Sequence, residues 1–242
     1  MEVPDSLAAL IVAGGTGTRL GADRPKQLLP LEGRPVLAHT IDRFLDYRHD
    51  LYVMVVLHPS LLQDWPSFVA EHFAEKQRPR IQACTGGKER TESVQSGLDA
   101  LKEWGLPPHA LVAIHDAVRP FIDDNFLERG FNMAKELGNA TAGVPVKSSL
   151  RMRTKTGSKA VDRSLFFHVQ TPQIFRLAEI ADCYRNRDLN AVFTDDASLA
   201  ESLGMVIHLF EGHYDNIKIT TPDDLYVAQQ ILLKNKNRKV TS

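Results

Sequence analysis

The chain has 242 residues and a formal net charge of -1, because 29 lysines and arginines are balanced by 30 aspartates and glutamates. Hydrophobic residues make up 43% of it and 15 glycines come in addition, which is typical of a globular protein with a sizeable core in one large or two small domains. This composition excludes collagen, coiled coils and disordered chains, and a charge so close to zero gives no global field for binding nucleic acid or a membrane.

Short apolar runs that predict β-strands recur along the chain. In chain order they are Leu7–Ala13, Leu51–Leu57, Ile81–Thr85, Ala110–His115, Ala140–Val146, Val206–Phe210 and Asn216–Thr220. The second run is apolar throughout, as expected of a strand that is covered on both faces.

Helical patterns lie between these runs, at residues 94–101, 123–138, 177–184 and 221–232. Asp123 and Gly138 are typical of the residues that begin and end a helix, and Thr221 followed by Pro222 is a second helix start. Alternating strands and helices predict an α/β fold, with a doubly wound, mainly parallel sheet that binds ligands beyond the carboxyl ends of its strands.

Residues 147–167 do not fit this alternation. The segment is polar and charged and lacks a helical period, and Thr154–Ser158 is typical of a hairpin turn. We therefore expect a single domain over residues 1–242 with a protruding β-arm at about 147–167, which we call the arm.

The chain carries no sign of a membrane or disulfide-bonded protein. Its longest apolar run, Leu51–Leu57, is far shorter than the roughly 20 residues that span a bilayer, and its first residues include no basic side chain. Its two cysteines, Cys84 and Cys183, form neither a disulfide framework nor a CxxC site. These features predict a cytoplasmic protein.

A glycine-rich loop at residues 13–21 follows the first predicted strand and reads AGGTGTRLG. Backbone N–H groups of such a loop can line an anion site, although a plain connection between strand and helix has a similar composition. The loop glycines are one residue too far apart for the dinucleotide-binding fingerprint. Arg19 and the following Lys26 favour a triphosphate ligand, because cations neutralise its charge where small residues let the chain approach.

Three further positions carry candidate chemistry. Residues 86–93 (GGKERTES) start a helix and either hold a base or phosphate or form an ordinary helix N-terminus. Asp116, at the end of a buried strand, is a candidate metal or ligand contact, or a capping residue paired with Arg119. Lys218 places a charge within an apolar strand pattern, where lysines usually extend to solvent at an edge.

Taken in order, these motifs resemble the 2-C-methyl-D-erythritol 4-phosphate cytidylyltransferases over roughly residues 7–233. The matching stretches are AGGTGTRL, PKQ, GGKERTESV, HDAVRP, VDR, QTPQ, FTDDAS and EGHYDNIKITTPDDL. Ribitol-5-phosphate cytidylyltransferases share several of them, so the motifs identify the chemistry better than the polyol. The VDR stretch at residues 161–163 favours methylerythritol phosphate.

The resemblance implies CTP as co-substrate, Mg²⁺ as metal and a homodimer with interlocked arms. By matching positions, the CTP-binding residues are Ala13, Gly14, Gly15, Gly87, Arg90 and Ser93. The catalytic cations are Arg19, Lys26, Arg163 and Lys218, and the residues on the polyol phosphate side are Asp116, Ser149, Arg163, Thr171 and Lys218. The resemblance does not identify the ligands of the metal.

The implied reaction is attack by the substrate's phosphate on the α-phosphorus of CTP, with pyrophosphate as the leaving group. A phosphate monoester is already a nucleophile at neutral pH, which agrees with the lack of a Ser, Cys or His triad in the sequence. A regulatory domain of the same fold without catalysis is the alternative of another class, but it would be expected to lack Arg19, Lys26 or Lys218. The spacing of the loop glycines also disfavours a dehydrogenase.

Overall fold

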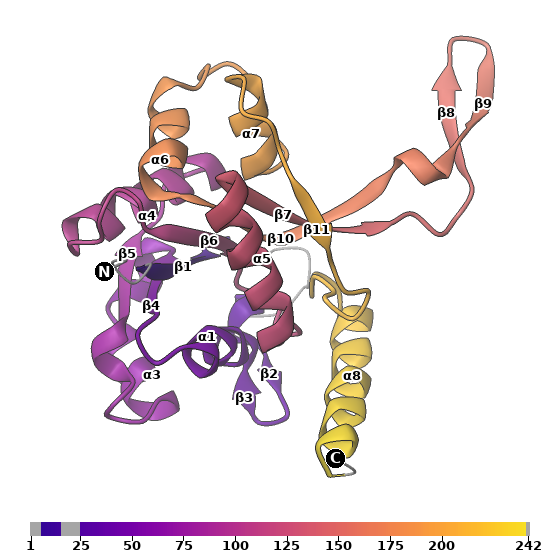
Figure 1. Ribbon diagram of the computed structural model, residues 1–242. Helices are drawn as coiled ribbons and strands as arrows, with labels where there is room; N and C mark the ends of the chain where they lie inside the picture. The colour runs from indigo at the N-terminus through magenta and orange to yellow at the C-terminus, as the bar shows by residue number, and fades with distance from the viewer. Residues whose placement is uncertain (1–5, 16–24, 241–242) are drawn as a thin grey trace.

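The structure, a computed structural model, describes residues 6–15 and 25–240, with side chains as far as residue 235. A central sheet of seven strands has the order β11-β7-β10-β6-β1-β4-β5 (Figure 1). The bounds of these strands are β1 (Leu7–Ala13), β4 (Tyr52–Leu57), β5 (Ile81–Thr85), β6 (Leu111–Asp116), β7 (Asn139–Pro145), β10 (Phe167–Arg176) and β11 (Leu209–Glu211). Within this described sheet β10 is antiparallel to both neighbours and the other pairings are parallel.

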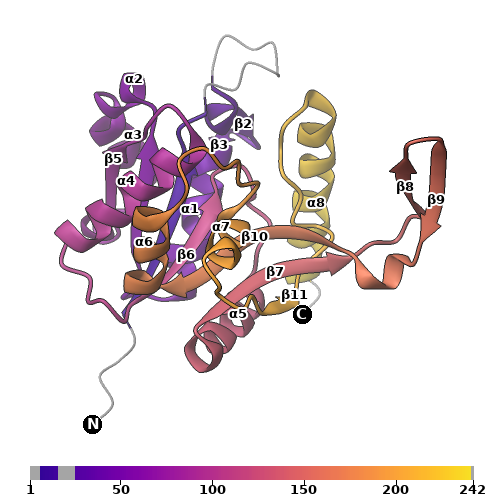
Figure 2. The same ribbon diagram turned by 90° about the horizontal axis from the view of Figure 1, so that it is seen from above.

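Helices cover both faces of the sheet (Figures 1 and 2). Their bounds are α1 (Val36–Tyr47), α2 (Pro59–Leu62), α3 (Trp65–His72), α4 (Arg90–Glu103), α5 (Asp124–Leu137), α6 (Leu177–Asn186), α7 (Asp196–Ser202) and α8 (Pro222–Val240). Alternate residues of a strand point to opposite faces. Ile11 of β1 accordingly packs in the cluster with α1, α3 and α5, and Leu10 packs in the cluster with α4, α6 and α7. The predicted doubly wound sheet is confirmed.

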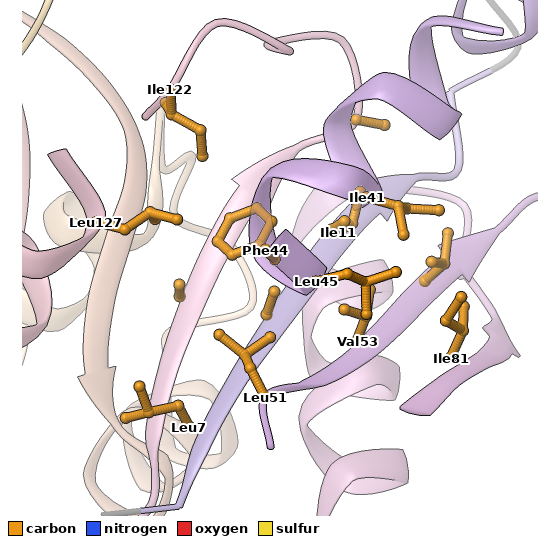
Figure 3. Packing of buried hydrophobic residues seen from close by; sticks show 14 of the residues in the cluster. Leu7, Ile11, Ile41, Phe44, Leu45, Leu51, Val53, Ile81, Ile122 and Leu127 are labelled. Carbon is orange, nitrogen blue, oxygen red and sulfur yellow. The ribbon is translucent and has the colours of Figure 1, made fainter. Parts of the chain in front are cut away.

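The first of these clusters is the larger one. Phe44 and Ile41 of α1 lie over Ile11 and Val53 of the sheet (Figure 3), and all four side chains are fully buried. Full burial of one such side chain contributes about 1.5–3 kcal/mol relative to its exposure. The sheet is thereby a rigid base for the loops at its carboxyl edge.

The last helix packs apart from these two layers. Ala228 and Ile231 of α8 form a third buried cluster with Leu31 and Ile219. Leu31 belongs to a short hairpin of β2 (Pro30–Leu31) and β3 (Arg34–Pro35). Neither α8 nor any other helix in the part of the chain that the structure describes is long and apolar enough to cross a membrane.

One strand prediction is wrong, one is confirmed only in part, and the strands β2, β3 and β10 were not predicted. Residues 216–220 form no strand, because Ile219 N donates to a single carbonyl, that of Val118, and its side chain packs on α8. The run Val206–Phe210 yields only the short β11. Strand β10 escaped prediction because its centre is polar and includes Pro172, yet residues 170–175 are buried between β6 and β7. This segment forms a strand because it is buried between two neighbouring strands, and not because of its local sequence pattern.

The arm has the predicted hairpin. Its strands β8 (Leu150–Thr154) and β9 (Gly157–Val161) pair in antiparallel register around the turn at residues 155–156. Figure 1 and Figure 2 both show the hairpin projecting away from the sheet. Almost all arm side chains are exposed, and β10 carries the chain back from the arm into the sheet.

Replacing Gly97 by alanine should destabilise the protein, because α4 lies very close to the sheet there. A Cβ atom at this position would lie 2.3 Å from Leu10 Cδ1 and 2.7 Å from Val56 Cγ2, both fully buried residues. We expect a loss of about 1–2 kcal/mol in the free energy of unfolding, since overpacking outweighs the better helix propensity of alanine. Gly157→Ala, which meets no atom within 4 Å, is the control, and equal urea midpoints for the two variants would contradict this account.

Candidate active site

A pocket lies at the carboxyl ends of β1 and β6, where a doubly wound sheet is expected to bind its ligand. It is lined by the predicted residues Ala13, Gly14, Gly15, Lys26, Gly87, Arg90, Ser93, Asp116 and Lys218. These residues come from five separate stretches of sequence. The fold therefore brings most of the predicted site together.

The start of the first loop is held in place by Gln27. Its amide nitrogen donates to the carbonyl oxygens of Ala13 at 2.7 Å and Gly15 at 3.2 Å, and the residue is 1% exposed. These bonds fix the backbone next to Lys26, which lies on the same 3-10 turn. Sequence analysis gave Gln27 no role, although it belongs to the PKQ stretch.

The small residues of the pocket wall are needed because α4 begins very close to them. A Cβ atom on Gly87 would lie 2.3 Å from Glu92 Cβ, and one on Gly14 would lie 3.2 Å from Ser93 Oγ. The start of α4 is also a capping box, in which the carboxylate of Glu92 accepts from the backbone nitrogens of Lys88 and Glu89. Residues 86–93 therefore form an ordinary helix N-terminus and also contribute to the pocket wall, so both predicted alternatives hold.

Arg90 reaches the pocket from the first turn of α4 and is bound to a buried acid. Its two terminal nitrogens donate to both carboxylate oxygens of Asp196, at 2.8 and 2.7 Å, and Asp196 is fully buried. The Tyr184 hydroxyl donates to the same carboxylate at 2.5 Å. Neither Asp196 nor Tyr184 was a predicted site residue, although Asp196 lies in the FTDDAS stretch, which matches the family.

Asp116 is the central charge of the pocket floor. Its Oδ2 lies 3.0 Å from Arg119 Nε and 3.1 Å from Lys218 Nζ. Burial alone would raise the pKa of this carboxyl, but Lys218 and Arg119 hold it well below its usual range. Asp116 is therefore ionised, and the predicted pairing with Arg119 exists together with its place in the pocket.

The loop that carries Lys218 is fastened to β10. Arg119 Nη1 donates to the carbonyl oxygen of Asn216 at 2.8 Å, and Asn216 Nδ2 donates to that of Thr171 at 2.9 Å. Gln170 adds a bond from its Nε2 to the His213 carbonyl at 2.8 Å. Neither Gln170 nor Asn216 was a predicted site residue: the strand predicted at residues 216–220 gave Asn216 no such role, and Gln170 lies in the unpredicted strand β10.

The remaining predicted residues lie elsewhere. Thr171 does not line the pocket as far as the structure describes it, but its Oγ1 accepts from the backbone nitrogen of Asp116 at 3.0 Å. Ser149 and Arg163 are exposed on the arm, where Arg163 donates to the Lys147 carbonyl. Arg19 lies outside the described residues.

The donor set of the pocket suits a metal that arrives with phosphate. Among the described residues no cluster of three or more His, Cys, Asp or Glu side chains could hold an ion. Mg²⁺, however, is commonly held by one or two carboxylates together with phosphate oxygens of the substrate. Asp116, an ionised carboxylate in the wall, could supply such a ligand.

His115, next to Asp116, should make stability depend on pH. It is fully buried, and burial lowers its pKa from 6.5 to about 4. The unfolded chain therefore binds more protons between these values, so stability falls as the pH drops through this window, by about 3 kcal/mol in total. The measurement is the free energy of unfolding in urea between pH 6.5 and pH 4. Its dependence on pH should be weaker in His115→Gln, whereas His109→Gln, at an exposed position, should keep the dependence of the wild type. The same pH dependence in both variants would contradict the account.

The fold and the pocket together are typical of one class of protein. A mainly parallel sheet that brings the first residues of a glycine-rich loop and a helix start to one cation-lined pocket is the arrangement of a nucleotide-binding α/β protein. The profile of the 2-C-methyl-D-erythritol 4-phosphate cytidylyltransferases matches residues 7–234. The chain belongs to this family of nucleotidyltransferases.

Individual relatives agree with this assignment. The 2-C-methyl-D-erythritol 4-phosphate cytidylyltransferase of Bacteroides thetaiotaomicron is 38% identical, over 93% of this chain and 99% of its own. That of Clostridium acetobutylicum is 36% identical, over 94% and 97%. The crystal structure of the protein of this name from Thermus thermophilus is 30% identical, with a TM-score of 0.72 over 93% of this chain and 98% of that one.

Proposed function

We propose that the protein transfers CMP from CTP to 2-C-methyl-D-erythritol 4-phosphate and releases pyrophosphate. The proposal rests on the pocket at the carboxyl ends of β1 and β6, which Lys26, Arg90 and Lys218 line together with the first residues of the glycine-rich loop, 13–15. Membership of the family supports the choice of both substrates. This reaction is a step of isoprenoid precursor synthesis by the non-mevalonate route.

The main physical task is to bring two polyanions together. The phosphate of the polyol is itself the nucleophile, so the protein has to align it with the α-phosphorus and stabilise the charge that develops. We assign Arg19 and Lys26 to the triphosphate and Lys218 and Arg163 to the attacking phosphate. Loss of one such preorganised donor costs about 10²–10³-fold in rate.

The other site residues divide between the two substrates. The proposed CTP-binding residues are Ala13, Gly14, Gly15, Gly87, Arg90 and Ser93, all in the pocket wall. The proposed residues on the polyol phosphate side are Asp116, Ser149, Arg163, Thr171 and Lys218. Mg²⁺, with Asp116 as a protein ligand, would neutralise charge on the triphosphate when bound.

Ser149 and Arg163 require a second copy of the chain. Both lie on the exposed arm and outside the pocket of their own chain, and a two-stranded hairpin is at best marginally stable alone. We propose a homodimer in which the arm of each single-domain chain completes the pocket of its partner. The two cysteines, both unpaired, are in keeping with a cytoplasmic location.

Turnover with two polyols tests the proposed substrate. Purified protein with CTP and Mg²⁺ should release pyrophosphate faster with 2-C-methyl-D-erythritol 4-phosphate than with ribitol 5-phosphate, because the VDR stretch and the named relatives favour the first. A reversed preference would assign the chain to ribitol phosphate. CTP binding without turnover of either polyol would indicate the catalytically silent regulatory domain.

Mixing two inactive variants tests the shared site. Lys26→Ala removes a cation from the pocket, and Arg163→Ala removes one from the arm, so each homodimer should lose at least about 100-fold in rate. In a mixed dimer, one site carries both lesions and the other carries neither. After equal mixing, half of the dimers are mixed and half of their sites are intact, so about a quarter of wild-type activity should return.

The control for this experiment combines two lesions from one pocket. Lys26→Ala mixed with Asp116→Asn should recover nothing, because every site in the mixed dimer then has one lesion. Subunit exchange is verified by mass spectrometry of differently tagged chains. Equal results from both mixtures, or full activity of a monomer, would place the whole site within one chain.

A further inference from the structure

Arg90 differs from Lys218 because, among the described residues, its buried acid pairs with no second cation. Asp196 is 0% exposed and binds the guanidinium through both oxygens. Such a bidentate pair is strong and fixes the plane of the arginine. Burial alone would lower the pKa of Arg90, but Asp196 raises it, so the group stays charged.

The surroundings of Asp196 hold it still. The Tyr184 hydroxyl donates to its Oδ1, and burial raises the pKa of that phenol, so the proton stays on the tyrosine. The first turn of α7 is fastened to β10 through Gln173, which donates to Asp195 Oδ2 at 2.9 Å and accepts from Ala197 N at 2.8 Å. The arginine is thus positioned by a chain of contacts that extends into the sheet.

The charge around Asp116 is different. There, two cations, Arg119 and Lys218, face one carboxylate, so one positive charge is left for an anion as far as the described residues go. At Arg90 the cation and its carboxylate cancel. A guanidinium has five N–H donors, of which Asp196 occupies two. What Arg90 offers to a ligand is therefore directed hydrogen bonds rather than net charge.

We propose that Asp196 and Tyr184 are positioning residues, which hold Arg90 as a charge-compensated donor to the nucleoside part of CTP. The phosphates are bound instead by the cations that the proposed function assigns to them. This inference rests on the proposed function, because it takes CTP to be the nucleotide. It adds two residues outside the pocket lining to the machinery that selects the nucleotide.

Direct binding of two probes tests the inference. Asp196→Asn keeps the size of the side chain but removes the charge that orients Arg90. Isothermal titration should show CTP binding weakened by about ten- to hundredfold, the value of a hydrogen bond to a charged group. Tripolyphosphate, which has no nucleoside, should bind the variant at least as tightly as the wild type. An equal loss for both probes, or no loss for CTP, would overturn the proposal.

A milder variant covers the case in which Asp196→Asn fails to fold. Tyr184→Phe removes one hydroxyl and leaves the ion pair, so CTP binding should weaken by about three- to tenfold. The KM for the polyol phosphate should stay unchanged, which a general loss of structure would not allow. Wild-type affinity for CTP in Tyr184→Phe would then overturn the proposal on its own.

A matched ion pair elsewhere is the control. Arg34 and Asp42 lie 2.5 Å apart outside the pocket, and Asp42 is also mostly buried. Asp42→Asn should lower the melting temperature without changing CTP affinity. The wild-type protein distinguishes failure of the proposed function from failure of the positioning role. If the wild type binds no CTP, the proposed function is wrong. If the wild type binds CTP and Asp196→Asn binds it equally well, only the positioning role is wrong.

Discussion

A buried, ionised carboxylate at Asp116 is the constraint on which the pocket depends. Removing a carboxylate from water is costly unless cations and hydrogen bonds compensate it, and here Arg119 and Lys218 do so. Each partner brings a further segment of the chain, because Arg119 also binds the Asn216 carbonyl and Thr171 binds the Asp116 backbone. The charge thereby joins β6 to the loop of Lys218, and the bond from the Asp116 backbone to Thr171 joins the same residue to β10.

A buried carboxylate paired with a cation occurs a second time at the pocket, but there the charges cancel. Around Asp116 the cations exceed the acids, whereas at Arg90 the acid of α7 cancels the cation. Both carboxylates are buried and both are placed by contacts to β10, through Thr171 in one case and Gln173 in the other. A single strand therefore supports both a charged and a neutral part of the pocket wall.

The sequence predicted the parts that local chemistry decides. The apolar run of β1, the Asp123 cap and Gly138 after α5 are local signals, and the structure has Asp123 accepting from Phe126 N and Gly138 at φ 90°. The motifs also located most of the pocket lining. Strand β10 and the Asp196 pair could not be predicted in this way, because their burial depends on partners distant in sequence. Asp196, for example, meets Arg90 across 106 residues.

Strand β10 has a mechanical consequence for assembly. Its first residues pair with β7 next to the arm, and its last residues, from Gln173 to Arg176, pair with β6 in the middle of the sheet. The base of the arm is therefore held in the sheet by paired strands, so the direction in which the chain leaves the sheet is set before a second chain arrives. Association then requires less loss of conformational freedom than the ordering of a loose tail would.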